Sequence, residues 1–143
     1  MNVSARNKFS GKITSVVNGA VNVEVELTTA GGDNLVAIVT EASVKSLGLA
    51  IGINVIAFVK APWIMLLTGV ADVRFSARNQ FTGKVASLKE GAVNSEVGLQ
   101  LHGGTVVYAV VTNEAAAELC LKQGIEATAL IKASHIILGV PVN

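Results

Sequence analysis

The stretch SARNKFSGK at residues 4–12 recurs as SARNQFTGK at residues 76–84, and this recurrence determines how the chain is organised. Around it, residues 4–67 align with residues 76–139 at a constant offset of 72 positions and without a gap. About 29 of the 64 aligned positions are identical. Self-similarity at a constant spacing is typical of a repeated structural unit. The sequence therefore predicts a duplicated domain, with units at 1–69 and 70–143 and a linker over 68–75.

Within each unit, hydrophobic and polar side chains alternate with a period of two. Between Val21 and Thr28 the hydrophobic residues occupy every second position, and polar residues stand between them. This alternation is typical of a β-strand with one buried face. The pairs Gly31-Gly32 and Gly103-Gly104 follow, and glycine supplies the positive φ that a hairpin turn needs. The sequence therefore predicts a β-hairpin in each unit, completed in the first by a strand over 35–39.

A short helix is predicted after each hairpin. In the first unit it covers 40–48, where Thr40 is a capping residue and Gly48 ends the segment; in the second it covers 112–119 and is richer in alanine. Two further apolar strands per unit are predicted, over 53–60, 64–67, 125–132 and 136–138. Five strands with a helix between the third and fourth indicate an OB-like barrel. We expect an all-β protein with one short helix per domain, built as two tandem OB-like five-stranded β-barrels.

Composition restricts the classes of partner. The 143 residues are 51% hydrophobic and 15% charged, with a formal net charge of +1, so no global field attracts nucleic acid or an anionic membrane. Cys120 is the only cysteine, which excludes a disulfide within the chain. The most hydrophobic stretch, 47–67, is interrupted by polar residues and a proline. We expect a cytoplasmic protein without a membrane partner, whose two small apolar domains bury further surface by self-association.

Polar residues that recur at matching positions of both units are the candidates for function. They are mostly hydrogen-bond donors: Ser4 and Ser76, Arg6 and Arg78, Asn7 and Asn79, Thr40 and Thr112, and Lys60 and Lys132. A tetrahedral dianion needs many donors and a little positive charge, which hydroxyls, amides, Arg, Lys and free backbone N–H groups supply. These residues could instead be solvated strand-end charges and helix caps. Spacing alone leaves both interpretations open.

The two units differ at two hydroxyl positions. The Ser43 hydroxyl, with the first turn of the predicted helix, could face an anion bound beside Lys60 and Ser4. Ala115 replaces Ser43 in the second unit, and Ser134 stands there where the first unit has Pro62. We expect Ser134 to compensate within the second unit for the lost hydroxyl, which would leave two sites of similar but unequal affinity.

The repeated SARN, GAVN and Lys-Ala motifs resemble the Mop or molbindin family of molybdenum-binding domains. SARN and GAVN stand in register in both units, and VKA at 59–61 and IKA at 131–133 follow. The two-unit architecture resembles the ModG-type di-molbindins. The resemblance implies an OB-like fold, a homotrimer with sites at subunit interfaces, and reversible binding of molybdate or tungstate. It implies no cofactor, and molybdenum only as the oxyanion.

The resemblance also implies where the oxyanion binds. In the first copy the site residues are Ser4, Arg6, Lys60 and Ala61 of one domain, with Thr40 and Ser43 of a neighbouring one. In the second copy they are Ser76, Arg78, Thr112, Lys132, Ala133 and Ser134. A second type of site near the oligomer axis would be lined by Gly19, Ala20, Val21 and Asn22 and by Gly91, Ala92, Val93 and Asn94.

Other functions are less favoured by the residues. An OB-fold nucleic-acid-binding module is the main alternative, but single strands usually need stacking aromatics on a basic groove, and the chain has only six aromatic residues. Gly11-Lys12 and Gly83-Lys84 lack the upstream glycine and following hydroxyl of a P-loop. A ligand-free structural oligomer is a further possibility.

Residues suited to catalysis do not recur in a useful pattern. His102 and His135 occur in one unit only. Glu24 and Glu96 do recur, but on an alternating strand they are expected to face solvent or a subunit interface. We therefore expect no enzyme activity and no catalytic residues.

Overall fold

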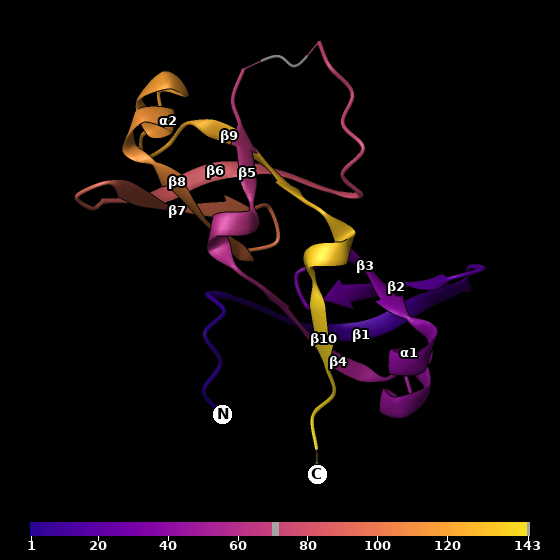
Figure 1. Cartoon of the computed structure of the whole chain (residues 1–143). Helices are drawn as coiled ribbons and strands as arrows, with labels where there is room; N and C mark the ends of the chain where they lie inside the picture. Colours follow the sequence, from indigo (N-terminus) through magenta and orange to yellow (C-terminus); the bar gives the residue numbers. More distant parts are fainter. Residues whose placement is uncertain (70–71, 143) are drawn as a thin grey trace.

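The computed structural model describes residues 1–69 and 72–142, so that part of the predicted linker and the last residue lie outside the described residues. The first repeat contains, in chain order, β1 (Asn7–Asn18), β2 (Asn22–Thr29), β3 (Asn34–Thr40), α1 (Glu41–Leu47), β4 (Asn54–Val59), the 3-10 turn η1 (Ala61–Trp63) and β5 (Met65–Leu67). Strands β1, β2 and β3 form an antiparallel meander, and β4 pairs with the other edge of β1. The predicted hairpin and helix are confirmed (Figure 1).

The second repeat has the same order of elements. They are β6 (Asn79–Glu90), β7 (Asn94–Leu101), β8 (Val106–Thr112), α2 (Asn113–Glu118), β9 (Glu126–Ile131), the 3-10 turn η2 (Ala133–His135) and β10 (Ile137–Gly139). The strands β6, β7, β8 and β9 pair in the same registers as their counterparts, including a bulge in the long first strand. The prediction of an all-β protein with one short helix per repeat is confirmed.

The last strand of each repeat pairs with the sheet of the other repeat. The first sheet has the order β10-β4-β1-β2-β3, and the second has the order β5-β9-β6-β7-β8. Figure 1 shows the yellow β10 beside β4 of the first repeat and the magenta β5 within the second sheet. The prediction of two five-stranded units is confirmed, but the expectation that each repeat supplies all five of its own strands is wrong at the last strand. The division at residues 69 and 70 stays a prediction about the sequence repeats.

The exchange has a physical reason in the 3-10 turns that precede the last strands. Lys60 and Ile64, which flank η1, have extended backbones, so the chain leaves β4 and crosses to the other sheet instead of folding back in a hairpin. The crossing is compatible with both sheets because the exchanged strands place the same residue type against the core, the partly buried Leu66 corresponding to the buried Leu138. The alternation predicted for the strands is visible in the core, where Val25 and Val97 are fully buried.

Two buried asparagines join the repeats. The Asn7 side chain donates to the Tyr108 carbonyl oxygen (2.8 Å) and accepts from the Tyr108 amide (2.7 Å). Asn79 makes the same pair of bonds with Val36, both of 2.8 Å. Each side chain thus satisfies free backbone groups on β8 or β3, the edge strand of the opposite sheet. The asparagines of the two SARN motifs are therefore structural.

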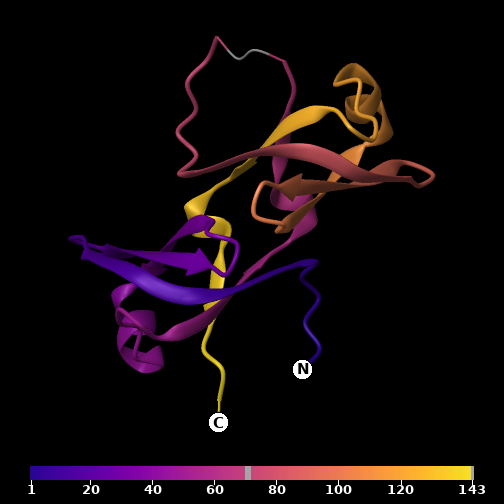
Figure 2. The same cartoon turned by 180° about the vertical axis from the view of Figure 1, so that it is seen from behind.

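The arrangement separates the two long hairpins. Figure 2, seen from behind, shows the β1–β2 and β6–β7 hairpins extending in opposite directions and both chain ends on one side of the molecule. Among the described residues no helix has the length and apolar character needed to cross a membrane.

Candidate functional site

Three hydroxyl side chains from the two repeats meet in one pocket, which we call the hydroxyl pocket. Thr40 and Ser43 come from the junction of β3 and α1, and Ser134 comes from η2 of the other repeat. The pocket has a volume of about 340 Å³. Its other lining residues are mostly apolar: Asn22, Ile38, Val39, Leu47, Leu49, Ile136, Ile137 and Leu138. The strand exchange creates this pocket, because it packs η2 and β10 against β3.

Hydrogen bonding within the hydroxyl pocket leaves donors available for a ligand. The Thr40 Oγ1 accepts from the Ser43 amide (3.1 Å), which caps α1, and donates to the Ser43 Oγ (2.8 Å). A hydroxyl can donate one hydrogen and accept two. The Ser43 and Ser134 hydroxyls therefore keep their own protons, and both residues line the pocket.

Two cations of the second repeat flank the hydroxyl pocket. Asn79 pairs with Ile131, so Arg78 and Lys132, one residue further on each strand, share one end of that sheet. Arg78 forms an ion pair with Glu24, which stands opposite Ile38 on the pocket wall. Lys132 directly precedes η2 and is exposed. Positive charge from the second repeat therefore lies near the pocket, although neither cation is among its lining residues.

The matching cations of the first repeat lie beside the other helix. Asn7 pairs with Val59, which places Arg6 and Lys60 together, and η1 packs against β8, the strand that ends at Thr112. The structure thus groups the cations of each repeat with the capping threonine of the other. Ser4 and Ser76 are exposed two residues before the arginines, and Ala61 and Ala133 are buried, so these alanines can offer only backbone groups.

Arg6 makes one contact more than its counterpart, with an aromatic ring. It forms an ion pair with Glu96 (3.4 Å), and its guanidinium lies 3.5 Å from the centroid of the Tyr108 ring. Desolvation lowers the pKa of Arg6, but the hydrogen bond and charge of Glu96, together with Tyr108, outweigh it and raise this pKa above its ordinary value. The recurring glutamates, expected at solvent or at a subunit interface, thus pair with the arginines across the interface between repeats.

The position of Ser134 corrects one expectation from the sequence. Ser134 was expected to compensate for Ala115 within the second unit, but it lies in the hydroxyl pocket with Ser43 of the first. The reason is the strand exchange, which moves η2 to the first sheet. The only sequence signal for this grouping is that the repeats differ at Ser43 and at Ser134. Those two differences are equally compatible with a grouping within one repeat and with a grouping across the repeats.

The GAVN segments form the tips of the two long hairpins. The Gly19 amide donates to the Asn22 carbonyl oxygen (2.9 Å), and Gly91 makes the same bond to Asn94 (2.8 Å). Val21 and Val93 are 80% and 70% exposed. Because the hairpins point apart, the two segments cannot share a site within one chain (Figure 2). Asn22 alone reaches the hydroxyl pocket.

Comparison with known proteins gives the family. Residues 3–66 and residues 76–138 each match the family described as TOBE domain. The chain belongs to the TOBE domain family. It carries two Mop-type TOBE repeats in tandem, as in the di-molbindins. The resemblance drawn from SARN and GAVN is therefore confirmed.

Several relatives of this TOBE chain are known. The solved structure of the cytoplasmic molybdate-binding protein ModG, with molybdate bound, is 53% identical, covers 99% of this chain and 100% of its own, and superposes with a TM-score of 0.94. The molybdenum-pterin-binding protein MopA of Rhodobacter capsulatus is 45% identical over 141 residues, 99% of this chain and 53% of MopA. The molybdenum transport protein ModE of Herbaspirillum seropedicae is 41% identical over 140 residues, 98% of this chain and 52% of ModE. The chain thus spans about half the length of these two curated relatives.

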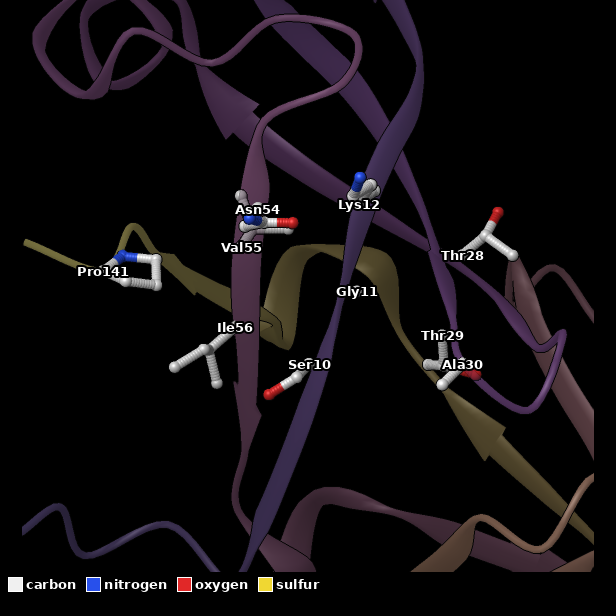
Figure 3. A pocket seen from close by; sticks show the side chains of 10 residues that line it. All are labelled: Ser10, Gly11, Lys12, Thr28, Thr29, Ala30, Asn54, Val55, Ile56 and Pro141. Atoms are coloured by element: carbon white, nitrogen blue, oxygen red, sulfur yellow. The ribbon is translucent and has the colours of Figure 1, made fainter.

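Each TOBE repeat also has a hollow on the outer side of its long first strand. In the first repeat its volume is about 580 Å³ and it surrounds Gly11, where a Cβ atom would collide with the Thr28 carbonyl oxygen. Figure 3 shows this hollow, with Lys12 as its only cationic side chain. A similar hollow of about 480 Å³ surrounds Gly83. Neither contains a predicted site residue, so the close packing of two strands accounts for these hollows.

Metal-ligating residues are not clustered in the part of the chain that the structure describes. Within residues 1–69 and 72–142 no three His, Cys, Asp or Glu side chains gather as they would around a metal ion. The candidate site is accordingly one of hydroxyls and cations.

Proposed function

We propose that this protein binds molybdate or tungstate as the intact oxyanion, in the hydroxyl pocket and in its counterpart beside Thr112, and thereby stores the metal in the cytoplasm. The observation that carries the proposal is the meeting of Thr40, Ser43 and Ser134 beside Lys132 and Arg78. The likeness to ModG, whose structure contains molybdate, supports it over the whole length of the chain.

The chemistry of the hydroxyl pocket suits a tetrahedral dianion. Hydroxyl groups donate to the oxyanion oxygens, and such charge-assisted bonds are roughly twice as strong as neutral ones. The lysine supplies positive charge without demanding one geometry, because its three donors rotate on a flexible stem. No bond of the oxyanion is made or broken, so the protein acts as a binding protein without a cofactor rather than as an enzyme.

Assembly completes the proposal. The hydroxyl pocket is open to solvent at Thr40 and Ser134, so a neighbouring subunit can cover it. The exposed Val21 and Val93 at the hairpin tips offer apolar surface for a homotrimer. In such a trimer the two GAVN segments would line the second type of site near the axis. Nucleic acid and membranes are not partners in this proposal.

Titration calorimetry of the full chain tests the function. Molybdate and tungstate should bind with several ions per oligomer, whereas sulfate and single-stranded DNA should give no heat. If neither molybdate nor tungstate binds and single-stranded DNA does, the proposal is wrong and the protein is a nucleic-acid-binding OB fold. The oligomer mass is measured alongside, because binding sites at subunit interfaces need the trimer.

Substitution of the two lysines tests the site. Lys60→Ala and Lys132→Ala should each weaken molybdate binding by about 10-fold, the effect of losing one charged hydrogen-bond donor. Thermal unfolding without ligand should stay unchanged, because both side chains are exposed. Lys12→Ala is the matched control, since Lys12 lines the outer hollow. Unchanged affinity in both lysine variants would remove lysine from the mechanism.

A further inference from the structure

We propose that the two oxyanion sites of one chain are unequal, with the hydroxyl pocket as the tight site and its counterpart beside Thr112 as the weak one. The inference rests on the proposed function. One half of this nearly symmetric molecule carries most of the affinity, and a few hydroxyl residues produce the difference.

The exchange of last strands concentrates the hydroxyls on one side. Because η2 packs against β3, Ser134 joins Thr40 and Ser43 in the hydroxyl pocket. In the counterpart site η1 packs against β8 in the same way, and the 72-residue offset places Pro62 and Ala115 there with Thr112. Three hydroxyls therefore stand on one side and a single hydroxyl on the other. Had each repeat kept its own last strand, the division would have been two to two.

Counting available protons leaves the same inequality. In the hydroxyl pocket Thr40 gives its proton to Ser43, so two hydroxyls, those of Ser43 and Ser134, can donate to an anion. In the counterpart site the Thr112 Oγ1 accepts from the Ala115 amide (3.0 Å) and keeps one proton to donate. Pro62 offers neither a hydroxyl nor an amide hydrogen. The pocket thus has one more hydroxyl donor, and its counterpart has none that could replace it.

The charged groups do not offset this difference. Each site has one lysine, Lys132 at the hydroxyl pocket and Lys60 at the counterpart, and one arginine paired with a glutamate. The arginine beside the counterpart is Arg6, which also lies over the Tyr108 ring. Among the described residues Arg78 makes no such ring contact, because Val36 stands where the other repeat has Tyr108. The two arginines thus differ in their contacts, but each site keeps one arginine and one lysine, so the difference between the sites lies in the hydroxyls.

The expected size of the difference follows from one charge-assisted hydrogen bond. Such a bond changes affinity by roughly 10- to 100-fold. Titration of the full chain with molybdate should therefore resolve two classes of site, one for each pocket, separated by about that factor. Sites shared at an oligomer axis would add a class that none of the substitutions below affects.

Reciprocal variants test the assignment. Ser43→Ala with Ser134→Ala removes the extra hydroxyls, and the tight class should weaken by roughly 10- to 100-fold while the weak class stays unchanged. Ala115→Ser with Pro62→Ser adds hydroxyls to the counterpart, and the weak class should tighten toward the other. Thermal unfolding without ligand shows that each variant is folded, and Ser10→Ala, on the surface of β1, is the control.

The outcomes separate this inference from the proposed function. If the hydroxyl pocket and its counterpart bind molybdate as a single class of site, or if both double variants keep the wild-type pattern, the inequality is wrong and the function stands. If the wild-type chain binds no molybdate or tungstate, the function itself is wrong and the inequality falls with it. A shift of the tight class in the first variant and of the weak class in the second supports both.

Discussion

Replacing Asn79 by alanine should destabilise the protein far more than an ordinary polar substitution would. The Asn79 side chain is 2% exposed and makes three hydrogen bonds to backbone groups. Its Oδ1 accepts from the Val36 amide, and its Nδ2 donates to the carbonyl oxygens of Val36 (2.8 Å) and Ile131 (3.2 Å). Alanine removes all three bonds and opens the contact between the second repeat and β3.

The magnitude follows from the groups left without a partner. The amide and carbonyl of Val36 lie on an edge strand and lose their bonds on that side, at a cost of about 1–2 kcal/mol each. The Ile131 carbonyl loses the longest bond and adds less. The sum is about 3–5 kcal/mol, which lowers the melting temperature of a chain of this length by roughly 10–15 °C.

Thermal and urea unfolding at several protein concentrations measures this loss, because self-association would otherwise contribute to the apparent stability. Asn7→Ala removes two such bonds, to Tyr108, and should cost about 1 kcal/mol less than Asn79→Ala. Asn18→Ala, on an exposed side chain at the end of β1, should change stability by less than about 0.5 kcal/mol. A loss below about 1 kcal/mol for Asn79→Ala would refute the view that these bonds hold the repeats together.

Two further substitutions test local backbone geometry. Cys120 has a φ of 53° at the position where the first repeat has Gly48, so Cys120→Gly should raise the free energy of unfolding by about 0.5–1 kcal/mol; no gain in thermal unfolding would show that this conformation carries no strain. Gly11→Ala should cost about 2 kcal/mol or more because its Cβ would meet the Thr28 carbonyl oxygen, whereas the neighbouring Ser10→Ala should be neutral in urea unfolding, and equal stabilities would contradict this packing argument.

Local patterns in the sequence determined most of the secondary structure. The alternation from Val21 to Thr28 corresponds to β2, and the Thr40 side chain and Gly48 cap α1 as expected. These features depend on residues only a few positions apart, so their physics can be read from a short window of sequence. The family was also determined by the sequence, since SARN and GAVN recur in register. The 3-10 turns were missed because three-residue segments leave no periodic signal.

The tertiary structure alone decided how the repeats are combined. Because the repeats are similar, each last strand can pair with either sheet. No pattern within one repeat therefore tells whether that repeat keeps its last strand or exchanges it. Because of the exchange, Ser134 lies near Ser43 and not near Ala115, and the cations of each repeat lie near the capping threonine of the other. The packing of the two sheets also gives Asn79 its structural role, which the repeated SARN motif left undetermined. The residues of the candidate site are local in sequence, but their grouping depends on contacts between strands more than 70 positions apart, and only the folded chain fixes those contacts.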